Sequence, residues 1–461
     1  MAVNQDKMKT RAIFPLLMSM AVPMMLSMLM QSLYNIVDSI FVARLGPEAL
    51  TAVSLVYPLQ NIVVSVAVGI GVGISSAISI SIGGKDFEKA NKTASIGMLL
   101  TVIHAVLFLV VGIVVTKPFL SMFTENAVIL RYGCEYSYIV LCLAFGCLLQ
   151  ISMEKIFQAV GDMVTTMALL ASGCIINIIL DPIMIFGLLG FPALGVKGAA
   201  IATVIGQISA FLLYVLVYRK KDIGIKISLK YVSFDKGIIK QIYSVGIPST
   251  IMMALPSLLV SILNGILSRF SDLHVAVLGI YFKLQTFIYM PANGVVQGMR
   301  PIIGFNYGAG EKKRMKQTVH LSLLVVFCVM LIGTIGALVF PRQILMLFDA
   351  TDDMMKIGTE ALRVISLGFL VSSIGIVNSG TFEALGRGKE SLIVSLLRQF
   401  VVTVPLGYLL SRSMGALGIW IAFPVAEVLA AVVAHILLKK IYRKISCSSE
   451  GKNKDPDLIC L

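Results

Sequence analysis

Residues 13–42 read IFPLLMSMAVPMMLSMLMQSLYNIVDSIFV, a long apolar run that contains a single charged residue, Asp38. About 20 mostly apolar residues are enough for a helix to cross the hydrocarbon core of a membrane. The run is far longer than the apolar core of a signal peptide and lacks a small-x-small cleavage site. We therefore predict that it forms the first membrane-spanning helix.

The composition indicates that the whole chain is an integral membrane protein. Hydrophobic residues make up 57% of the 461 residues and charged residues only 13%, with a mean hydropathy of +0.92. An ordinary soluble chain has about 45–50% apolar and about 25% charged residues. The net charge of +14 does not indicate a nucleic-acid partner, because no polar stretch is long enough for the folded domain that such binding needs.

Apolar runs separated by polar or Pro/Gly breaks predict an all-α membrane fold with twelve spanning helices. The predicted spans start near Ile13, Ala52, Ala94, Gly133, Thr165, Ala199, Ser244, Val275, Thr318, Ala361, Ser391 and Ala416. Of the 38 lysine and arginine residues, 25 lie in segments that would share one side of the membrane: residues 7–11, 85–92, 219–240, 312–316, 387–389 and 439–454. The opposite side has nine. The positive-inside rule therefore predicts that both termini are cytoplasmic.

The two halves of the chain align without gaps at a separation of 225 residues. The matched pairs include Pro23 with Pro248, Arg44 with Arg269, Gln60 with Gln285, Gly69 with Gly294, Gly73 with Gly298, Gly83 with Gly308, Glu135 with Glu360, and Gly161 with Gly386. Each repeat holds six spans, so both insert in the same orientation and are related by a pseudo-two-fold axis along the membrane normal, which favours a cavity between two lobes.

These patterns predict four parts of the chain. They are an N-terminal six-helix lobe (1–218), a cytoplasmic linker (219–243), a C-terminal six-helix lobe (244–445) and a flexible cytoplasmic tail (446–461).

The sequence contains no motif for catalysis, for a cofactor or for nucleotide hydrolysis. The four histidines are scattered over distant segments, and the seven cysteines include no CxxC pair. There is also no HExxH motif and no phosphate-binding loop. We therefore expect a transporter without a cofactor rather than an enzyme, and an ion gradient as its driving force.

Two acidic residues of the first half are predicted to form a cation site. Gln31, Tyr34 and Asp38 form one polar stripe on the first span, and Asn177 and Asp181 lie four residues apart on one face of the fifth. A carboxylate in mid-bilayer costs at least about 2.5–3.5 kcal/mol on insertion scales, so each one needs a reason. If the two helices face each other, the group could hold a proton or a desolvated Na⁺. The alternatives are that Asp38 pairs with Arg44 at the outer helix end and that Asp181 merely precedes Pro182 at a helix end.

Other polar residues within the spans are candidates for the substrate cavity. They are Gln31, Tyr34, Gln150, Glu154, Gln285 and Tyr289. Glu154 either pairs with the neighbouring Lys155 or contacts a cationic drug, and Arg398 and Glu427 could form a buried pair in the second lobe.

The chain resembles a known family of transporters. The segments Pro58-Leu-Gln-Asn-Ile62 and Val296-Gln-Gly-Met-Arg-Pro-Ile-Ile-Gly-Phe-Asn-Tyr-Gly-Ala-Gly310, together with the two six-helix halves, are similar to the multidrug and toxic compound extrusion (MATE) family. The resemblance covers residues 14–444 and is strongest to the bacterial branch typified by the MepA and DinF exporters. It implies a functional aspartate at Asp38, an Asn-x-x-x-Asp pair at Asn177 and Asp181, and a cation-binding threonine at Thr203. Another branch carries its ion-binding acids in the second lobe, where this chain has only Asn264 and an inner-end Glu383, so that site is not carried over.

The resulting hypothesis is a secondary active multidrug exporter of the bacterial inner membrane. It would export amphipathic, mostly cationic organic compounds against inward H⁺ or Na⁺ by alternating access, with Na⁺ held by Asp38, Asn177 and Asp181. We expect a monomer whose partners are drugs and membrane lipids. The alternative is a lipid or lipid-linked oligosaccharide flippase, which would need a more basic cavity than the acidic first lobe offers.

Overall fold

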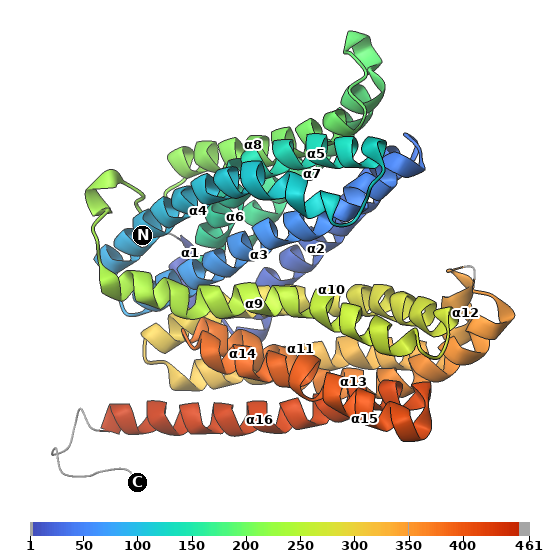
Figure 1. Ribbon diagram of the computed structural model, residues 1–461. Coiled ribbons are helices and arrows are strands. Elements are labelled where there is room, and N and C mark those ends of the chain that lie inside the picture. Colours follow the sequence, from blue (N-terminus) through green and yellow to red (C-terminus); the bar gives the residue numbers. More distant parts are fainter. Residues whose placement is uncertain (1–2, 349, 451–461) are drawn as a thin grey trace. The chain divides into compact units, whose positions relative to one another are not determined.

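The computed structural model describes residues 3–348 and 350–450 of the chain, and the regular elements in this part are helices (Figure 1). The long helices are α2 (Ile13–Ala43), α3 (Pro47–Gly83), α4 (Phe87–Ser121), α7 (Met163–Phe186), α8 (Val196–Lys220), α9 (Lys236–Leu267), α10 (Asp272–Gly308), α11 (Lys312–Val339), α13 (Asp352–Ala384) and α16 (Ala416–Glu450). The shorter elements are α1 (Val3–Thr10), α5 (Ala127–Cys142), α6 (Phe145–Ala159), α12 (Pro341–Met346), α14 (Gly388–Leu396), α15 (Thr403–Met414) and the single turns Leu188–Gly190 and Leu229–Tyr231.

The predicted all-α membrane fold with twelve spans is confirmed. In the described residues eleven helical segments are long and apolar enough to cross a membrane, and α5 and α6 together make the twelfth, bent by 44° at their junction. One of the eleven, Gly388–Met414, joins α14 and α15 through a π-helical turn at Leu397–Val401. Such turns insert one extra residue into a helix and commonly lie at functional positions.

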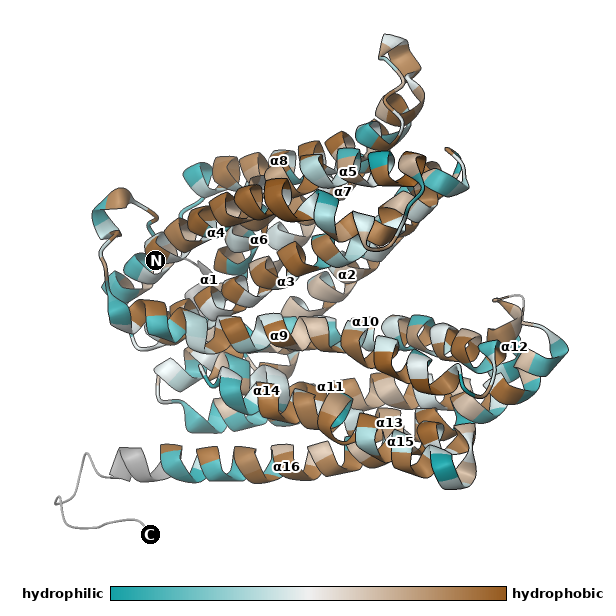
Figure 2. Cartoon of the chain, viewed as in Figure 1, coloured by the Kyte–Doolittle hydropathy of each residue, from teal (hydrophilic) through white to brown (hydrophobic). Residues whose placement is uncertain are grey.

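The helices extend beyond the apolar windows that predicted them. Helix α9 begins at Lys236 rather than near Ser244, and α13 begins at Asp352 rather than near Ala361. A rise of about 1.5 Å per residue means that only about 20 residues lie in hydrocarbon, and the remaining turns reach the polar interface. Figure 2 shows this division, with hydrophilic residues gathered at helix ends and hydrophobic residues between them.

The chain divides into two compact units. Unit 1 comprises residues 1–254, 293–322 and 383–388, and unit 2 comprises residues 255–292, 323–382 and 389–461. Unit 1 therefore contains the predicted first lobe together with one end each of α9, α10, α11 and α13. The lobe boundaries derived from the sequence stay a prediction. Of the predicted tail, residues 446–450 continue α16, and residues 451–461 lie outside the described residues.

The recurring glycines make reciprocal close contacts within unit 1. A Cβ atom on Gly83 would overlap the carbonyl group of Phe305, and one on Gly308 would overlap the carbonyl group of Ile80. Ile80 and Phe305 are themselves 225 residues apart, so α3 and α10 make the same contact twice with the repeats exchanged. A two-fold relation between the repeats requires this reciprocity. The glycines are thus needed where one helix backbone lies directly against another.

The segment between α8 and α9 packs on the surface of unit 1. The backbone N–H of Lys226 donates to Asn91 Oδ1 (2.7 Å), and that of Ser228 donates to Ser95 Oγ (3.1 Å), both on α4. The non-helical part is shorter than the predicted linker, because α8 continues to Lys220 and α9 begins at Lys236.

The close approach at Gly73 predicts a selective loss of stability. A Cβ atom there would overlap the Ile242 carbonyl of α9, whereas one on Gly336 of α11 would meet no atom within 4 Å. Alanine gains about 1 kcal/mol over glycine in a helix interior, but overpacking costs about 1–3 kcal/mol. We expect Gly73→Ala to lower the melting temperature of the purified protein by several degrees and Gly336→Ala to leave it unchanged or raise it. Equal melting temperatures for the two variants would contradict the contact.

Candidate functional site: an acidic cluster between three helices

Helices α2, α7 and α8 pack against one another and bring four predicted site residues together. Helix α2 carries Asp38, α7 carries Asn177 and Asp181, and α8 carries Thr203. Asp181 is completely buried, and Asn177 and Thr203 are each 2% exposed. The four-residue spacing on α7 places the amide and the carboxylate on the same face, as the sequence predicted.

The amide of Asn177 links Asp181 to Thr203. Its Nδ2 lies 3.4 Å from Asp181 Oδ1 and 3.5 Å from Thr203 Oγ1. Rotating the amide by half a turn gives better contacts, because Nδ2 then donates to Asp181 Oδ2 at 3.0 Å and Oδ1 accepts from the Thr203 backbone N–H at 3.0 Å. The Thr203 hydroxyl donates to the carbonyl of Ala199 (3.0 Å), which leaves its lone pairs directed elsewhere.

Asp38 and Asp181 lie side by side. Their carboxyl groups are close enough to share a hydrogen bond when one of them carries a proton. Asp38 Oδ1 is buried and has no hydrogen-bond partner among the described residues. The guanidinium of Arg44 lies over the ring of Phe41, 6.0 Å from its centroid. In the part of the chain that the structure describes, no cation is paired with either carboxylate.

Two tyrosines and a glutamine complete the cluster. Tyr34 and Tyr136 lie near Thr203, and Gln60 lies near Tyr136. Tyr34 was predicted for the substrate cavity, and the structure also places it beside the cation candidates. Tyr136 was not predicted. The recurrence of Gln60 as Gln285 in the second repeat marked it as a residue of interest, but nothing in the sequence linked it to Asp38.

The predicted cavity residues lie in both units. In unit 1, Gln31 is exposed on α2 and Gln150 is half-buried on α6. In unit 2, Gln285 is half-buried and the Tyr289 hydroxyl donates to Ser372 Oγ (2.9 Å). The ring of Tyr289 lies 5.6 Å from the guanidinium carbon of Arg398.

The two predicted pairs of buried charges are present. Arg398 Nε lies 3.1 Å from Glu427 Oε1 in unit 2, which confirms that pair. Glu154 Oε1 lies 3.0 Å from Lys155 Nζ in unit 1, so of the two interpretations of Glu154 the structure shows the ion pair. Asp38, Asp181 and Glu154 thus have different surroundings: Glu154 has a cationic partner, whereas Asp38 and Asp181 have each other.

A cavity of about 550 Å³ lies near the N-terminal end of α2. Its lining includes Lys7, Arg11, Asp162 and Lys221, and none of the predicted cavity residues. Lys221 Nζ is paired there with Asp162 Oδ2 at 2.5 Å.

Comparison with known proteins places the chain among transporters. The family model MatE matches residues 23–183 and 248–409, one match in each repeat. The multidrug export protein MepA of Staphylococcus haemolyticus is 26% identical over 436 residues, covering 94% of this chain and 95% of that protein.

Solved structures agree with this placement. A crystal structure of MATE in the bent conformation has a TM-score of 0.91 at 26% identity, covering 97% of this chain and 99% of the other. An outward-facing multidrug resistance MATE family transporter of the MOP superfamily has a TM-score of 0.87 at 27% identity, covering 94% and 96%. With both repeats matched and the fold shared over nearly its whole length, the chain belongs to the MatE family of multidrug efflux transporters and is MepA-like.

Proposed function

We propose that this transporter is an antiporter that exports amphipathic, mostly cationic organic compounds against inward H⁺ or Na⁺. The observation that carries the proposal is the cluster of Asp38, Asp181, Asn177 and Thr203 inside the membrane-spanning bundle. Its relatives bear the name of multidrug export proteins, which favours drugs as the exported compounds.

The cluster has the chemistry of a site for one small cation. Two carboxylates in contact cannot both stay ionised without a counter-ion, since like charges repel strongly away from water. A proton shared between Asp38 and Asp181 would relieve that repulsion and satisfy the unpartnered Asp38 Oδ1. Na⁺ would do the same, with the Asn177 carbonyl and the Thr203 hydroxyl as further oxygen ligands of the kind that hard cations prefer.

Coupling follows if the site binds its ion more tightly in one conformation than in the other. An ion can shift a conformational equilibrium only by its differential affinity for the two states. The cluster is built by three helices, α2, α7 and α8, so a change in the position of α2 alone would separate Asp38 from Asp181. Ion entry from outside would then favour the conformation that releases the drug outward, in a chain whose termini are cytoplasmic and whose membrane is the bacterial inner membrane.

The carboxylates are expected to be essential. Asp38→Asn and Asp181→Asn should each reduce drug resistance to that of cells without the transporter, because an amide cannot exchange a proton or neutralise Na⁺. Thr203→Val should be milder, about tenfold, since one hydrogen-bonding group is lost. Drug susceptibility of expressing cells measures all three.

The matched control is Asp353→Asn, which removes an exposed carboxylate paired with Lys356 at 3.6 Å. It should retain full resistance. Membrane-inserted protein is quantified for every variant, and full resistance in an inserted Asp38→Asn variant would remove Asp38 from the mechanism.

A site for one monovalent cation also predicts the charge balance of transport. Exchange of one H⁺ or Na⁺ for a drug of charge +1 moves no net charge, so the membrane potential should not affect ethidium export from proteoliposomes. A neutral drug leaves one net charge moving, worth about 2.3 kcal/mol per 100 mV, or roughly a 50-fold gradient. Clamping the potential, with ΔpH or ΔNa⁺ imposed separately, tests both statements and identifies the ion. Export of a neutral drug that ignores the potential would contradict the stoichiometry.

A further inference from the structure

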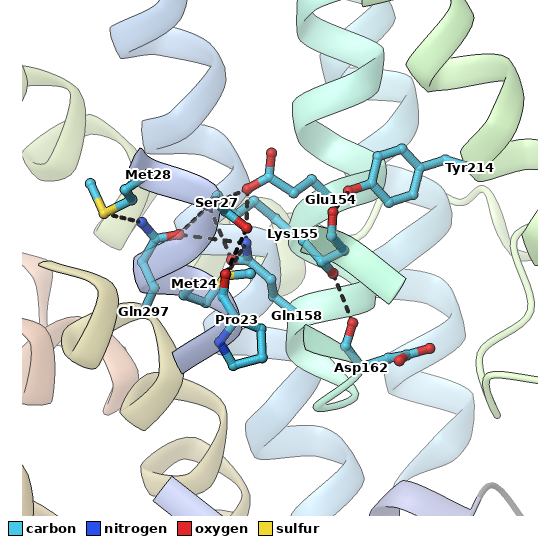
Figure 3. A network of polar contacts seen from close by, with 11 residues as sticks. Pro23, Met24, Ser27, Met28, Glu154, Lys155, Gln158, Asp162, Tyr214 and Gln297 are labelled. Carbon is cyan, nitrogen blue, oxygen red and sulfur yellow. Dashed lines mark hydrogen bonds and ion pairs between the residues drawn. The ribbon is translucent and has the colours of Figure 1, made fainter. Parts of the chain in front are cut away.

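A second buried polar cluster lies in unit 1. It is centred on α6, which contributes no residue to the acidic cluster. Figure 3 shows Glu154, Lys155 and Gln158 of α6 meeting Gln297 of α10 and two methionines of α2. Glu154, Lys155 and Gln158 are 7%, 4% and 4% exposed, respectively. A lysine so deeply buried needs a complete set of acceptors.

The ammonium group of Lys155 has such a set. Its Nζ donates to Glu154 Oε1 (3.0 Å), Gln158 Oε1 (3.0 Å) and Gln297 Oε1 (3.3 Å). An ammonium group carries three donors, so all three are used. We call these three oxygens, from Glu154, Gln158 and Gln297, the ammonium cradle.

The cradle is held in place by its own contacts. Gln158 Nε2 donates to Glu154 Oε1 (2.8 Å) and lies 3.3 Å from the Met24 sulfur. Gln297 Nε2 lies 3.5 Å from the Met28 sulfur. These donations fix both amides with their oxygens toward the ammonium, while the thioethers supply soft, polarisable walls.

The cradle is a feature of one repeat only. The residues 225 positions after Glu154 and Lys155 are Ser379 and Gly380, and the residue 225 before Gln297 is Val72. Gln158 corresponds to Glu383, which pairs with Arg300 of α10, so the second repeat has no lysine at the equivalent place. The stem of Lys155 lies against α3 at Gly71, where a Cβ atom would come within 2.6 Å of Lys155 Cγ. A buried ion pair is weak evidence for stability in itself, because desolvation offsets much of the attraction. The asymmetry therefore favours a role in recognition.

We propose that the ammonium cradle is a recognition site for the cationic nitrogen of a transported organic ammonium compound, and that Lys155 is its resident occupant when no substrate is bound. The proposal rests on the proposed drug export and names the substrate class of that function. Substrate exchange becomes possible when α10 withdraws Gln297, which loosens one of the three contacts to Lys155 Nζ.

Exchange of one cation for another has an electrostatic advantage. The Glu154 carboxylate always has a cationic partner, either Lys155 or the substrate. A buried carboxylate without one would be costly in free energy. The flexible four-carbon stem lets the Lys155 ammonium leave and return without a change in the α6 backbone. Its return displaces the substrate nitrogen, so the same side chain that reserves the site also promotes release. Neutral compounds gain no binding affinity from the ammonium cradle.

The test compares binding of the cation ethidium with binding of the neutral dye Nile red to the full-length protein in lipid nanodiscs. Lys155→Met removes the competing ammonium and should raise ethidium affinity about tenfold, and Glu154→Gln should lower it by about the same factor. Lys155→Arg should also lower ethidium affinity, because a planar guanidinium can donate two hydrogen bonds at once to the carboxylate and amide oxygens and is harder to displace. Nile red affinity should change little in all three.

The matched control is Lys221→Met, which breaks a different lysine–carboxylate pair of unit 1, that with Asp162, and should leave the ratio of the two affinities unchanged. A merely structural pair predicts otherwise: both Lys155 variants would lower ethidium and Nile red binding together, or Lys155→Arg would bind ethidium like the parent chain. Either result overturns the proposal. If Lys155→Met does not insert, Lys155→Arg alone still decides between them.

The same protein also separates this proposal from the proposed function. Parent proteoliposomes that export no drug under any ion gradient would refute the antiport. Parent proteoliposomes that export ethidium, with unaltered ethidium affinity in both Lys155 variants, would refute the cradle alone.

Discussion

The structure depends on the inability of hydrocarbon to solvate charge. Among the described residues, three basic side chains of the spanning helices have acidic partners: Lys155 with Glu154, Arg300 with Glu383, and Arg398 with Glu427. Lys283 of α10 lies instead over the ring of Phe348, 5.9 Å from its centroid. Each pair neutralises itself, and breaking one by removing a single partner leaves an uncompensated buried charge. Asp38 and Asp181 depart from this pattern because both members carry the same charge when ionised. That departure, rather than the mere presence of acidic residues in the membrane, is the reason why we propose a cation site at Asp38 and Asp181 and none at the three ion pairs.

A second constraint is the backbone contact between repeats in unit 1. Gly83 and Gly308 allow α3 and α10 to lie against each other with no side chain between them. Next to this contact, Ser76 donates to the carbonyl of Glu383 (2.7 Å), and Ser249 donates to its carboxylate (2.9 Å). The two serine hydroxyls therefore add hydrogen bonds beside the backbone contact.

The sequence predicts the two-repeat helical fold better than it predicts the details of the site. Glycine, proline and glutamine pairs at a fixed separation revealed the repeat, because these residues are not interchangeable with the apolar background. Asp38, Asn177 and Asp181 were found because ionisable residues in apolar runs are costly and a four-residue spacing fixes their face. Tyr136 could not be found in this way, since an aromatic residue in a spanning helix is usual and only the packing of α5 places it near Thr203.

Other features were missed for related physical reasons. The bend between α5 and α6 falls at Leu143 and Ala144, which are ordinary apolar residues, and the nearby Gly146 lies inside α6. The short helices α1 and α12 are too short for an apolar window to detect. Gln297 was quoted as part of a motif, but its contact with Lys155 depends on the rotation of α10, which tertiary packing sets.

The polar clusters show that two structural repeats need not have the same polar residues at equivalent positions. The reciprocal contacts of Gly83 with Phe305 and of Gly308 with Ile80 keep the repeats equivalent where they meet. The residue 225 positions after Asp38 is Leu263, so the acidic cluster has no counterpart of its first carboxylate. A ligand can shift a conformational equilibrium only if it binds one conformation better than the other. The glycine contacts are therefore symmetric between the repeats, whereas the carboxylates of the acidic cluster are not. Under the antiport proposed above, that asymmetry would let an ion favour one conformation.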